Sequence, residues 1–353
     1  MKTSMTNVSR NLRRAASLGA ILLGETLALS AQNYHQTLLV SDLSNVAAHT
    51  DTNLVNAWGL AIGEEGTLVV CATESSLAGF YRPDGRRVAD SIAVEEDPTG
   101  VEINRWGDAF RLMSGHVARP SRLLFVTEQG KIMGWNPRVN ASEAVVAVDN
   151  SAADAVYKGV ALARSRRGPR LYATNFRGGR VEVYDGSWHS LGAFTDPAVD
   201  PGFAPFNIVH LGGVLFVTFA KQQAPDFEDD QPGPGNGFVD IFDLDGHLLR
   251  RFASHGPLNS PWGVAMAPRH FGPFGGALLI GNFGDGHLNA FHPHTGAFLG
   301  PLTDAQGNAI AIDGLWALRF RHDEGDAVLY FTAGPGGETH GVIGKIEPER
   351  QHH

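Results

Sequence analysis

Short apolar runs of strand-like composition recur along the whole chain. They are rich in β-branched, leucine and aromatic residues and are bounded by turn-forming residues, which is typical of β-strands. Six of these runs are TLVVCATE, RLLFVTEQG, RLYATNFRGG, VLFVTFAKQ, ALLIGNFGDG and VLYFTAGPGG. No long stretch places apolar residues at helical spacing, so the pattern predicts little helix.

Each of these runs belongs to a larger unit with further strands. The segments that precede them are LVNAWGLAIG (54–63), PTGVEIN (98–104), YKGVALAR (157–164), FNIVHLGG (206–213), NSPWGVAMAP (259–268) and DGLWALRF (313–320). Most runs are followed by an aromatic strand that closes on a turn: GFYRPDG, KIMGWNP, RVEVYDG, GFVDIFDLDG and HLNAFHPHTG. A fourth short strand follows several of these, as in HLLRRFAS and AFLGPLT.

The repetition predicts an all-β fold, a six-bladed β-propeller. Six units recur with a period of about 40–55 residues, and four strands at such a period are typical of propeller blades. A single blade cannot bury both of its faces, so neighbouring blades must cover them, and a ring leaves no naked end. The additional strand YHQTLLVSD (34–42) is expected to pair into the last blade and close the ring. We therefore predict one propeller domain over 34–347 and a short tail over 348–353.

The N-terminus differs in character from the rest of the chain. A basic segment, MKTSMTNVSRNLRRAA, is followed by the mostly apolar SLGAILLGETLALSA. This order predicts a cleaved export signal over 1–31 and hence an extracytoplasmic protein, periplasmic or secreted. Glu25 interrupts the apolar part, so a basic leader on a cytoplasmic protein is the alternative. No later segment has the length of a membrane span, so we expect no integral membrane segment after signal removal.

Composition narrows the partners and the chemistry. The formal net charge is −9, with 37 acidic and 28 basic residues, which argues against a nucleic-acid partner because phosphate binding needs a basic footprint. The single cysteine, Cys71, excludes a disulfide within the chain and a cysteine-based zinc site. Its apolar surroundings predict a small buried side chain.

Several motifs resemble those of a known family. They are NLVNAWGLAIG, ATNFRGG, GPGNGFVDIFDLDG, LNSPWGVAMAP, GNFGDGHLNAFHPHTGAFLG and DGLWALRF. Over 34–346 the chain resembles a family of secreted bacterial proteins, some of which carry a C-terminal PEP-CTERM sorting signal, and more loosely it is similar to NHL and gluconolactonase-like six-bladed propellers. The resemblance implies a propeller and export, and no established reaction. The chain ends in IEPERQHH without an apolar anchor, and it has CATESSLAG where the family has an Asp-Asn-Gly type of loop.

Propeller topology places the starts of the first strands and the ends of the second strands on one face, near the axis. The first-strand residues are Asn56, Trp58, Thr99, Lys158, Asn207, Trp262 and Trp316. The second-strand residues are Glu74, Glu128, Asn175, Lys221, Asn282 and Gly334. The tryptophans are expected to fill gaps between blades. The charged groups either bind a ligand or pair with one another, because charge near the axis is costly when it is unpaired and desolvated.

Two longer loops are expected to border the same face. The loop 222–237 is acidic and rich in proline, and its carboxylates, which can supply oxygen ligands for calcium, are Asp226, Glu228, Asp229 and Asp230. The loop 334–341 holds His340, which is either a metal ligand or base or a free surface histidine. The insertion 105–121, with His116, is expected on the opposite face, and His292 and His294 in a turn between third and fourth strands.

These features leave two functions open. The first is the binding of a small molecule or protein partner at the axial pore mouth, and the predicted binding residues are Glu128, Lys158, Asn175, Asn207, Lys221, Asn282 and His340. The second is a metal-assisted hydrolase or lyase with a divalent cation, calcium or magnesium, in the central channel, for which the predicted ligands are Glu128, Asn175 and Asn282. No GxSxG, HExxH or CxxC motif occurs in the chain, which favours binding over catalysis.

Overall fold

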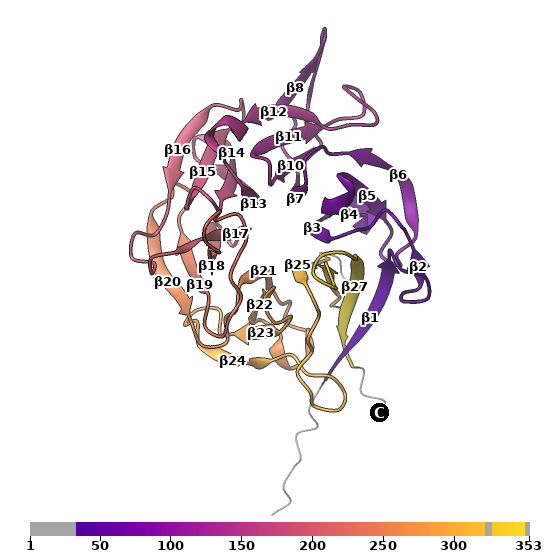
Figure 1. Ribbon diagram of the computed structural model, residues 1–353, viewed down its shortest axis with the longest axis vertical. Coiled ribbons are helices and arrows are strands. Elements are labelled where there is room, and N and C mark those ends of the chain that lie inside the picture. Colours follow the sequence, from indigo (N-terminus) through magenta and orange to yellow (C-terminus); the bar gives the residue numbers. More distant parts are fainter. Residues whose placement is uncertain (1–32, 322–326, 350–353) are drawn as a thin grey trace, which may run out of the picture. The chain divides into compact units, whose positions relative to one another are not determined.

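The computed structural model describes residues 33–321 and 327–349 and arranges six sheets of four or five strands around an axis (Figure 1). Five sheets have four strands and the sixth has five. This is the six-bladed β-propeller that the repeats predicted. The predicted export signal, and residues 350–353 of the predicted tail, lie outside the described residues.

The first three blades follow one another along the chain. Blade 1 contains β3 (Ala57–Ile62), β4 (Leu68–Ala72), β5 (Leu77–Tyr81) and β6 (Arg87–Ala93). Blade 2 contains β7 (Pro98–Ile103), β10 (Leu123–Thr127), β11 (Lys131–Trp135) and β12 (Val145–Asp149). Blade 3 contains β13 (Tyr157–Ser165), β14 (Gly168–Asn175), β15 (Arg180–Asp185) and β16 (Ser190–Phe194).

The next two blades repeat this order, and a hairpin and four short 3₁₀ turns lie in the connections of the described chain. Blade 4 contains β17 (Phe203–Leu211), β18 (Val214–Lys221), β19 (Phe238–Phe242) and β20 (Leu248–Ser254). Blade 5 contains β21 (Pro261–Met266), β22 (Leu278–Asn282), β23 (Leu288–Phe291) and β24 (Phe298–Pro301). The insertion in blade 2 forms the hairpin β8 (Arg111–Ser114) and β9 (Val117–Pro120). Short 3₁₀ turns are η1 (Glu64–Gly66), η2 (Thr73–Ser75), η3 (Ser151–Ala153) and η4 (Gly272–Phe274).

The two ends of the described chain close the ring in blade 6. This blade contains β25 (Leu315–Phe320), β26 (Leu329–Ala333), β27 (Val342–Pro348), β1 (Tyr34–Ser41) and the short β2 (His49–Thr50). Strand β1 pairs antiparallel with β27 along its whole length, and the two lie side by side in Figure 1. The prediction of a closing N-terminal strand is confirmed.

The first strand of every blade carries an irregularity at the axis. In blade 3, Tyr157 pairs with Asn175 and Gly159 with Thr174, so that Lys158 is an extra, unpaired residue. Such a bulge re-aims the side chain of the extra residue. The other five first strands show the same register shift at the same place. The six equivalent residues, which we call the axial ring, are Trp58, Thr99, Lys158, Phe206, Trp262 and Trp316.

The residue after the bulge is glycine in four of the six blades, where the neighbouring blade lies against it. A Cβ added to Gly159 would lie 2.2 Å from Oδ1 of Asn207 in blade 4. A Cβ added to Gly59 would lie 2.8 Å from the carbonyl oxygen of Thr99 in blade 2. The glycines that follow Trp58, Thr99, Lys158 and Trp262 therefore mark positions where neighbouring blades lie in close contact.

Further expectations concern single residues. Cys71 is fully buried in β4, and burial raises the pKa of its thiol. His292 and His294 are exposed in the turn between β23 and β24, as predicted. Within residues 33–321 and 327–349, no helix combines the length and the apolar character that a bilayer span requires.

Candidate functional site

The two faces of the ring differ in their loops. One face, here called the upper face, carries the connections into the first strands and the loops between second and third strands. It includes the loops 222–237 and 334–341, as the sequence predicted. The opposite or lower face carries the loops between first and second strands, including the hairpin of β8 and β9 with His116.

Aromatic side chains fill the axis below the upper face. The rings of Trp58 and Trp316 stack with centroids 3.6 Å apart, and Phe283 stacks on Trp316 at 3.9 Å. Trp262 packs edge-on against both tryptophans, and Phe206 lies 6.0 Å from Trp316. These residues come from blades 1, 4, 5 and 6, and we call them the aromatic plug.

Lys158 is the only cation of the axial ring and is almost completely buried. Its side chain is 2% exposed, and its ammonium lies 5.1 Å from the ring centroid of Trp58. The ammonium pairs with the carboxylate of Glu128 and lies 3.4 Å from that of Asp229. Burial disfavours its charge, but the attraction of Glu128 and Asp229 outweighs burial and holds the pKa of Lys158 above its usual value.

Carboxyl groups outnumber this lysine. Burial raises the pKa of Glu128 in spite of its pairing with Lys158. Burial also raises the pKa of Asp230 to about 6, although Ser260 and Lys158 oppose the shift. At Glu338 burial raises the pKa to about 7, again against the attraction of Lys158. The site therefore has more carboxyl groups than its single lysine can keep ionised.

A chain of hydrogen bonds joins Glu338 to the aromatic plug. Trp316 donates its Nε1–H to Oδ1 of Asn56 at 2.9 Å, and Nδ2 of Asn56 donates to Oε2 of Glu338 at 2.7 Å. Since an indole only donates, the contact fixes the orientation of the Asn56 amide. Asn56 and Glu338 both have positive φ, 50° and 68°, which is uncommon for residues other than glycine.

A polar pocket opens between blades 2 and 3, next to Glu128 and Asp229. Its volume is about 380 Å³, and among its lining residues are Glu128, Asp154, Arg177, Glu228 and Asp229. Glu228 and Asp229 belong to the loop 222–237, and Arg177 of blade 3 holds this loop through a 2.8 Å ion pair with Glu228. The loop thus borders the pocket, and the lining is rich in carboxylates.

The other predicted binding residues have partners of their own. Oδ1 of Asn175 accepts two backbone N–H groups and its Nδ2 donates to Glu182. The Nδ2 group of Asn282 donates to the carbonyl of Pro257 and to Asp285. Each amide thus joins the loop after the second strand of its blade to the connection that enters the first strand of that blade.

The three remaining predicted residues, all within the described chain, form no side-chain hydrogen bond or ion pair with Lys158, Glu128 or Asp229. Nδ2 of Asn207 donates to the carbonyl of Trp262 at 2.8 Å and ties blade 4 to blade 5. Lys221 is half-buried at the end of β18 and forms no ion pair with another described residue. Nδ1 of His340 lies 2.9 Å from Oδ2 of Asp42, which follows the closing strand β1.

Two of the three predicted metal ligands already use an oxygen atom in a contact within the protein. The carboxylate of Glu128 is engaged by Lys158, and Oδ1 of Asn175 is used by two N–H donors. Oδ1 of Asn282 is buried without a hydrogen-bond partner, whereas Nδ2 of the same amide donates to Pro257 and Asp285. Among the described residues, no group of three or more His, Cys, Asp or Glu side chains is arranged to hold a metal ion. The donor set does not fit a resident metal.

Sequence reasoning did not single out Glu338 or Arg177. Glu338 lies two residues before His340, the residue that the sequence favoured in that loop. Its position depends on a left-handed backbone conformation, which a glutamate in a glycine-rich loop does not announce. The pairing of Arg177 with Glu228 depends on how the loop 222–237 folds back, which also has no local signal.

The fold and this site define a six-bladed propeller with a carboxylate-rich polar site on its upper face. No family model matches the chain. The uncharacterized protein L690 of Acanthamoeba polyphaga mimivirus is 30% identical over 323 residues, which cover 87% of this chain and 84% of that protein. The uncharacterized protein R648 of the same virus is 32% identical over 323 residues, 87% of this chain and 78% of that protein. The chain belongs to the family of these two proteins.

Solved structures share the fold at low sequence identity. A streptogramin B lyase matches 90% of this chain and 98% of its own, with 12% identity and a TM-score of 0.54. The gluconolactonase XC5397 of Xanthomonas campestris matches 92% and 93%, with 16% identity and a TM-score of 0.54. These similarities agree with the expected likeness to gluconolactonase-like propellers and show the fold alone.

Proposed function

We propose that this protein is an exported binding protein that takes a cationic group in the upper-face pocket beside the axis. The observation that carries the proposal is the imbalance of charge around Lys158. Burial raises the pKa values of Glu128, Asp230 and Glu338, and the attraction of the one buried lysine does not offset this effect. A ligand cation supplies the missing positive charge.

The pocket sets the size and chemistry of this ligand. A volume of about 380 Å³ suits a small organic molecule, or one long side chain of a protein partner. The carboxylates of Asp154 and Asp229 line it, and neither is committed to a strong ion pair: Asp229 is 75% exposed and lies 3.4 Å from Lys158. An ammonium or guanidinium group is the chemistry that these carboxylates recognise through charge-assisted hydrogen bonds.

Calorimetric titration with cadaverine and with argininamide tests the proposal. We expect binding accompanied by proton release, seen as a dependence of the heat on the ionisation enthalpy of the buffer, because the bound cation lowers the carboxyl pKa values. Asp229→Asn should weaken binding about tenfold by removing one charge-assisted contact. Asp90→Asn on the exposed outer strand β6 is the matched control.

Two results would count against this function. If neither cadaverine nor argininamide binds, the proposed binding function is wrong. Stoichiometric binding of calcium or magnesium that Glu128→Gln abolishes favours the metal-assisted alternative instead. Export is a separate part of the proposal and rests on the character of residues 1–31. N-terminal sequencing of the protein from cell fractions tests it: a mature N-terminus near residue 32 outside the cytoplasm is expected.

A second candidate function, an acid–base lyase or hydrolase, is favoured by Glu338. A carboxyl group with a pKa of about 7, oriented by Asn56, is suited to proton transfer near neutral pH. Assays with a streptogramin B and with gluconolactone test this candidate. Turnover that Glu338→Gln abolishes while ligand binding persists supports the enzymatic function. If neither compound is turned over, the binding function is favoured.

A further inference from the structure

The lower face carries a groove that the function proposed above does not use. Two adjoining hollows, of about 620 Å³ and 310 Å³, share Trp106 and Gly107 as lining residues. The larger hollow lies between blades 2 and 3, and the smaller lies along the base of the hairpin of β8 and β9. We call the two together the Trp106 groove.

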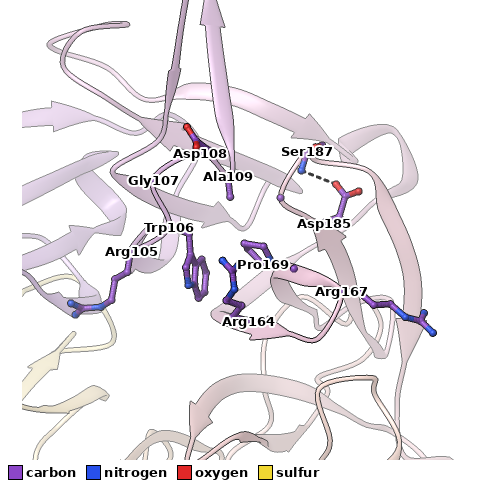
Figure 2. A pocket seen from close by; sticks show the side chains of 12 residues that line it. Arg105, Trp106, Gly107, Asp108, Ala109, Arg164, Arg167, Pro169, Asp185 and Ser187 are labelled. Atoms are coloured by element: carbon purple, nitrogen blue, oxygen red, sulfur yellow. Dashed lines mark hydrogen bonds between the residues drawn. The ribbon is translucent and has the colours of Figure 1, made fainter.

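Hydrogen bonds with the side chain of Asn104 hold the loop that carries Trp106. Oδ1 of Asn104 accepts the backbone N–H of Trp106 at 3.0 Å, and its Nδ2 donates to the carbonyls of Ala109 and Ser121. The half-buried ring packs against the hydrophobic core between blades 2 and 3. Figure 2 shows it in the middle of the larger hollow, with Arg164 beside it.

The charge of the groove is opposite to that of the protein. Its six lining arginines are Arg105, Arg164, Arg167, Arg119, Arg122 and Arg138. All six are exposed, and none forms an ion pair with another described residue. Figure 2 shows Arg105 and Arg167 extending to opposite sides of the Trp106 ring.

The two aspartates of the groove do not neutralise these arginines. Asp185 accepts the backbone N–H groups of Ser187 and His189, at 2.8 and 2.9 Å, and so belongs to its own turn. Asp108 lies 3.9 Å from Arg111, which lies outside the lining. Unpaired arginines at this density repel one another, and an anionic ligand removes that repulsion.

We propose that the Trp106 groove binds an acidic oligosaccharide, a chain of sugar rings that carry carboxylates. The apolar face of a sugar ring covers an indole, and the planar guanidinium groups on both sides match carboxylates at the ring edges. A linear chain of such rings reaches the arginines of both hollows. A single-stranded nucleic acid is less well matched, because its binding uses several stacking rings and Trp106 is the one aromatic residue among the described residues that line the groove.

Binding of fluorescently labelled trigalacturonate, measured by anisotropy at low ionic strength, tests this proposal. We expect saturable binding, no binding of labelled maltotriose, and loss of affinity as salt is raised. Arg164→Ala should weaken binding about tenfold or more, because it removes a charge-assisted contact. Arg269→Ala, an exposed arginine on the lower face of blade 5, is the control and should change nothing.

Other outcomes overturn the proposal. If Arg164→Ala and Arg269→Ala weaken trigalacturonate binding equally, the probe is attracted to positive charge in general and no specific site exists. If oligothymidylate binds as tightly as trigalacturonate, the ligand class is a nucleic acid and not an acidic sugar. If neither of these two anionic probes binds, the groove is not a binding site. Asp229→Asn on the upper face should leave trigalacturonate binding unchanged, so this inference and the proposed function fail independently.

Discussion

Trp316 donates its indole N–H to Asn56 over 2.9 Å, although the two residues lie 260 positions apart in the chain. The bond joins blade 6 to the connection that enters blade 1, next to the point at which β1 closes the ring. Asn56 passes the contact on to Glu338, so one amide links the hydrophobic axis to the carboxylate site.

Replacement of Asn56 tests this link. Asn56→Ala leaves the buried N–H of Trp316 and the Oε2 atom of Glu338 without their partner, and alanine is disfavoured at a φ of 50°. We expect a loss of about 2–4 kcal/mol in the free energy of unfolding, measured by urea denaturation. Asn53→Ala, an exposed change in the same loop, is the control; an equal loss in both variants would contradict the link.

The sequence predicted the frame of this molecule better than its site. The six recurring segments that precede the apolar runs were sufficient to locate the first strands, and in four of them a glycine follows the bulge because the neighbouring blade lies close. The same repeats predicted that Glu128 and Lys158 converge. The partners of Asn175 and Asn282 had no such signal, since a turn asparagine satisfies its own loop or reaches a ligand according to the exact backbone path.

The lower-face groove had no sequence signal either. Trp106 lies in the insertion 105–121 of blade 2 and Arg164 lies near the end of β13 in blade 3, so their proximity depends on how two blades pack. A net charge of −9 describes the whole chain and hides a local cluster of opposite sign. Composition thus limits the partners of a protein only as an average over its surface.

The pairing of Lys158 with Glu128 predicts strong energetic coupling. Lys158→Met leaves the Glu128 carboxylate without its partner and should cost about 3–5 kcal/mol at neutral pH. The double variant Lys158→Met/Glu128→Gln removes both charges, so it should be more stable than the sum of the single effects predicts. Urea denaturation of the four proteins measures the coupling. Additive losses would show that the two groups do not depend on each other.

The contact between blades 3 and 4 predicts a steric effect at Gly159. Gly159→Ala places a Cβ at 2.2 Å from Oδ1 of Asn207, so Asn207 must move and its bond to Trp262 is strained. We expect a loss of about 1–3 kcal/mol, as for other overpacked sites. Gly107→Ala has no atom within 4 Å of the new Cβ and should keep the melting temperature of the wild type. Equal melting temperatures for both variants would contradict the packing argument.

The raised pKa of Glu338 predicts a stability effect that depends on pH. The unfolded chain releases this proton near the ordinary pKa of 4.5, whereas the folded chain retains it up to a pKa of about 7. Glu338 therefore favours folding at acid pH, and this contribution is lost as the pH rises through about 7.

Glu338→Gln removes the titrating group and keeps an acceptor for Asn56. The variant should match the wild type in stability at about pH 5 and exceed it by about 2 kcal/mol at about pH 8, where the wild-type carboxylate is charged although it is partly buried and lies near Glu128 and Asp229. This value is smaller than the full pKa shift implies, because the side chain is partly solvated. Urea denaturation at the two pH values measures the difference. Asp90→Asn on the exposed strand β6 is the control, and its effect should be the same at both. A stabilisation by Glu338→Gln that is equal at both pH values would show that relief of ionisation is not its cause.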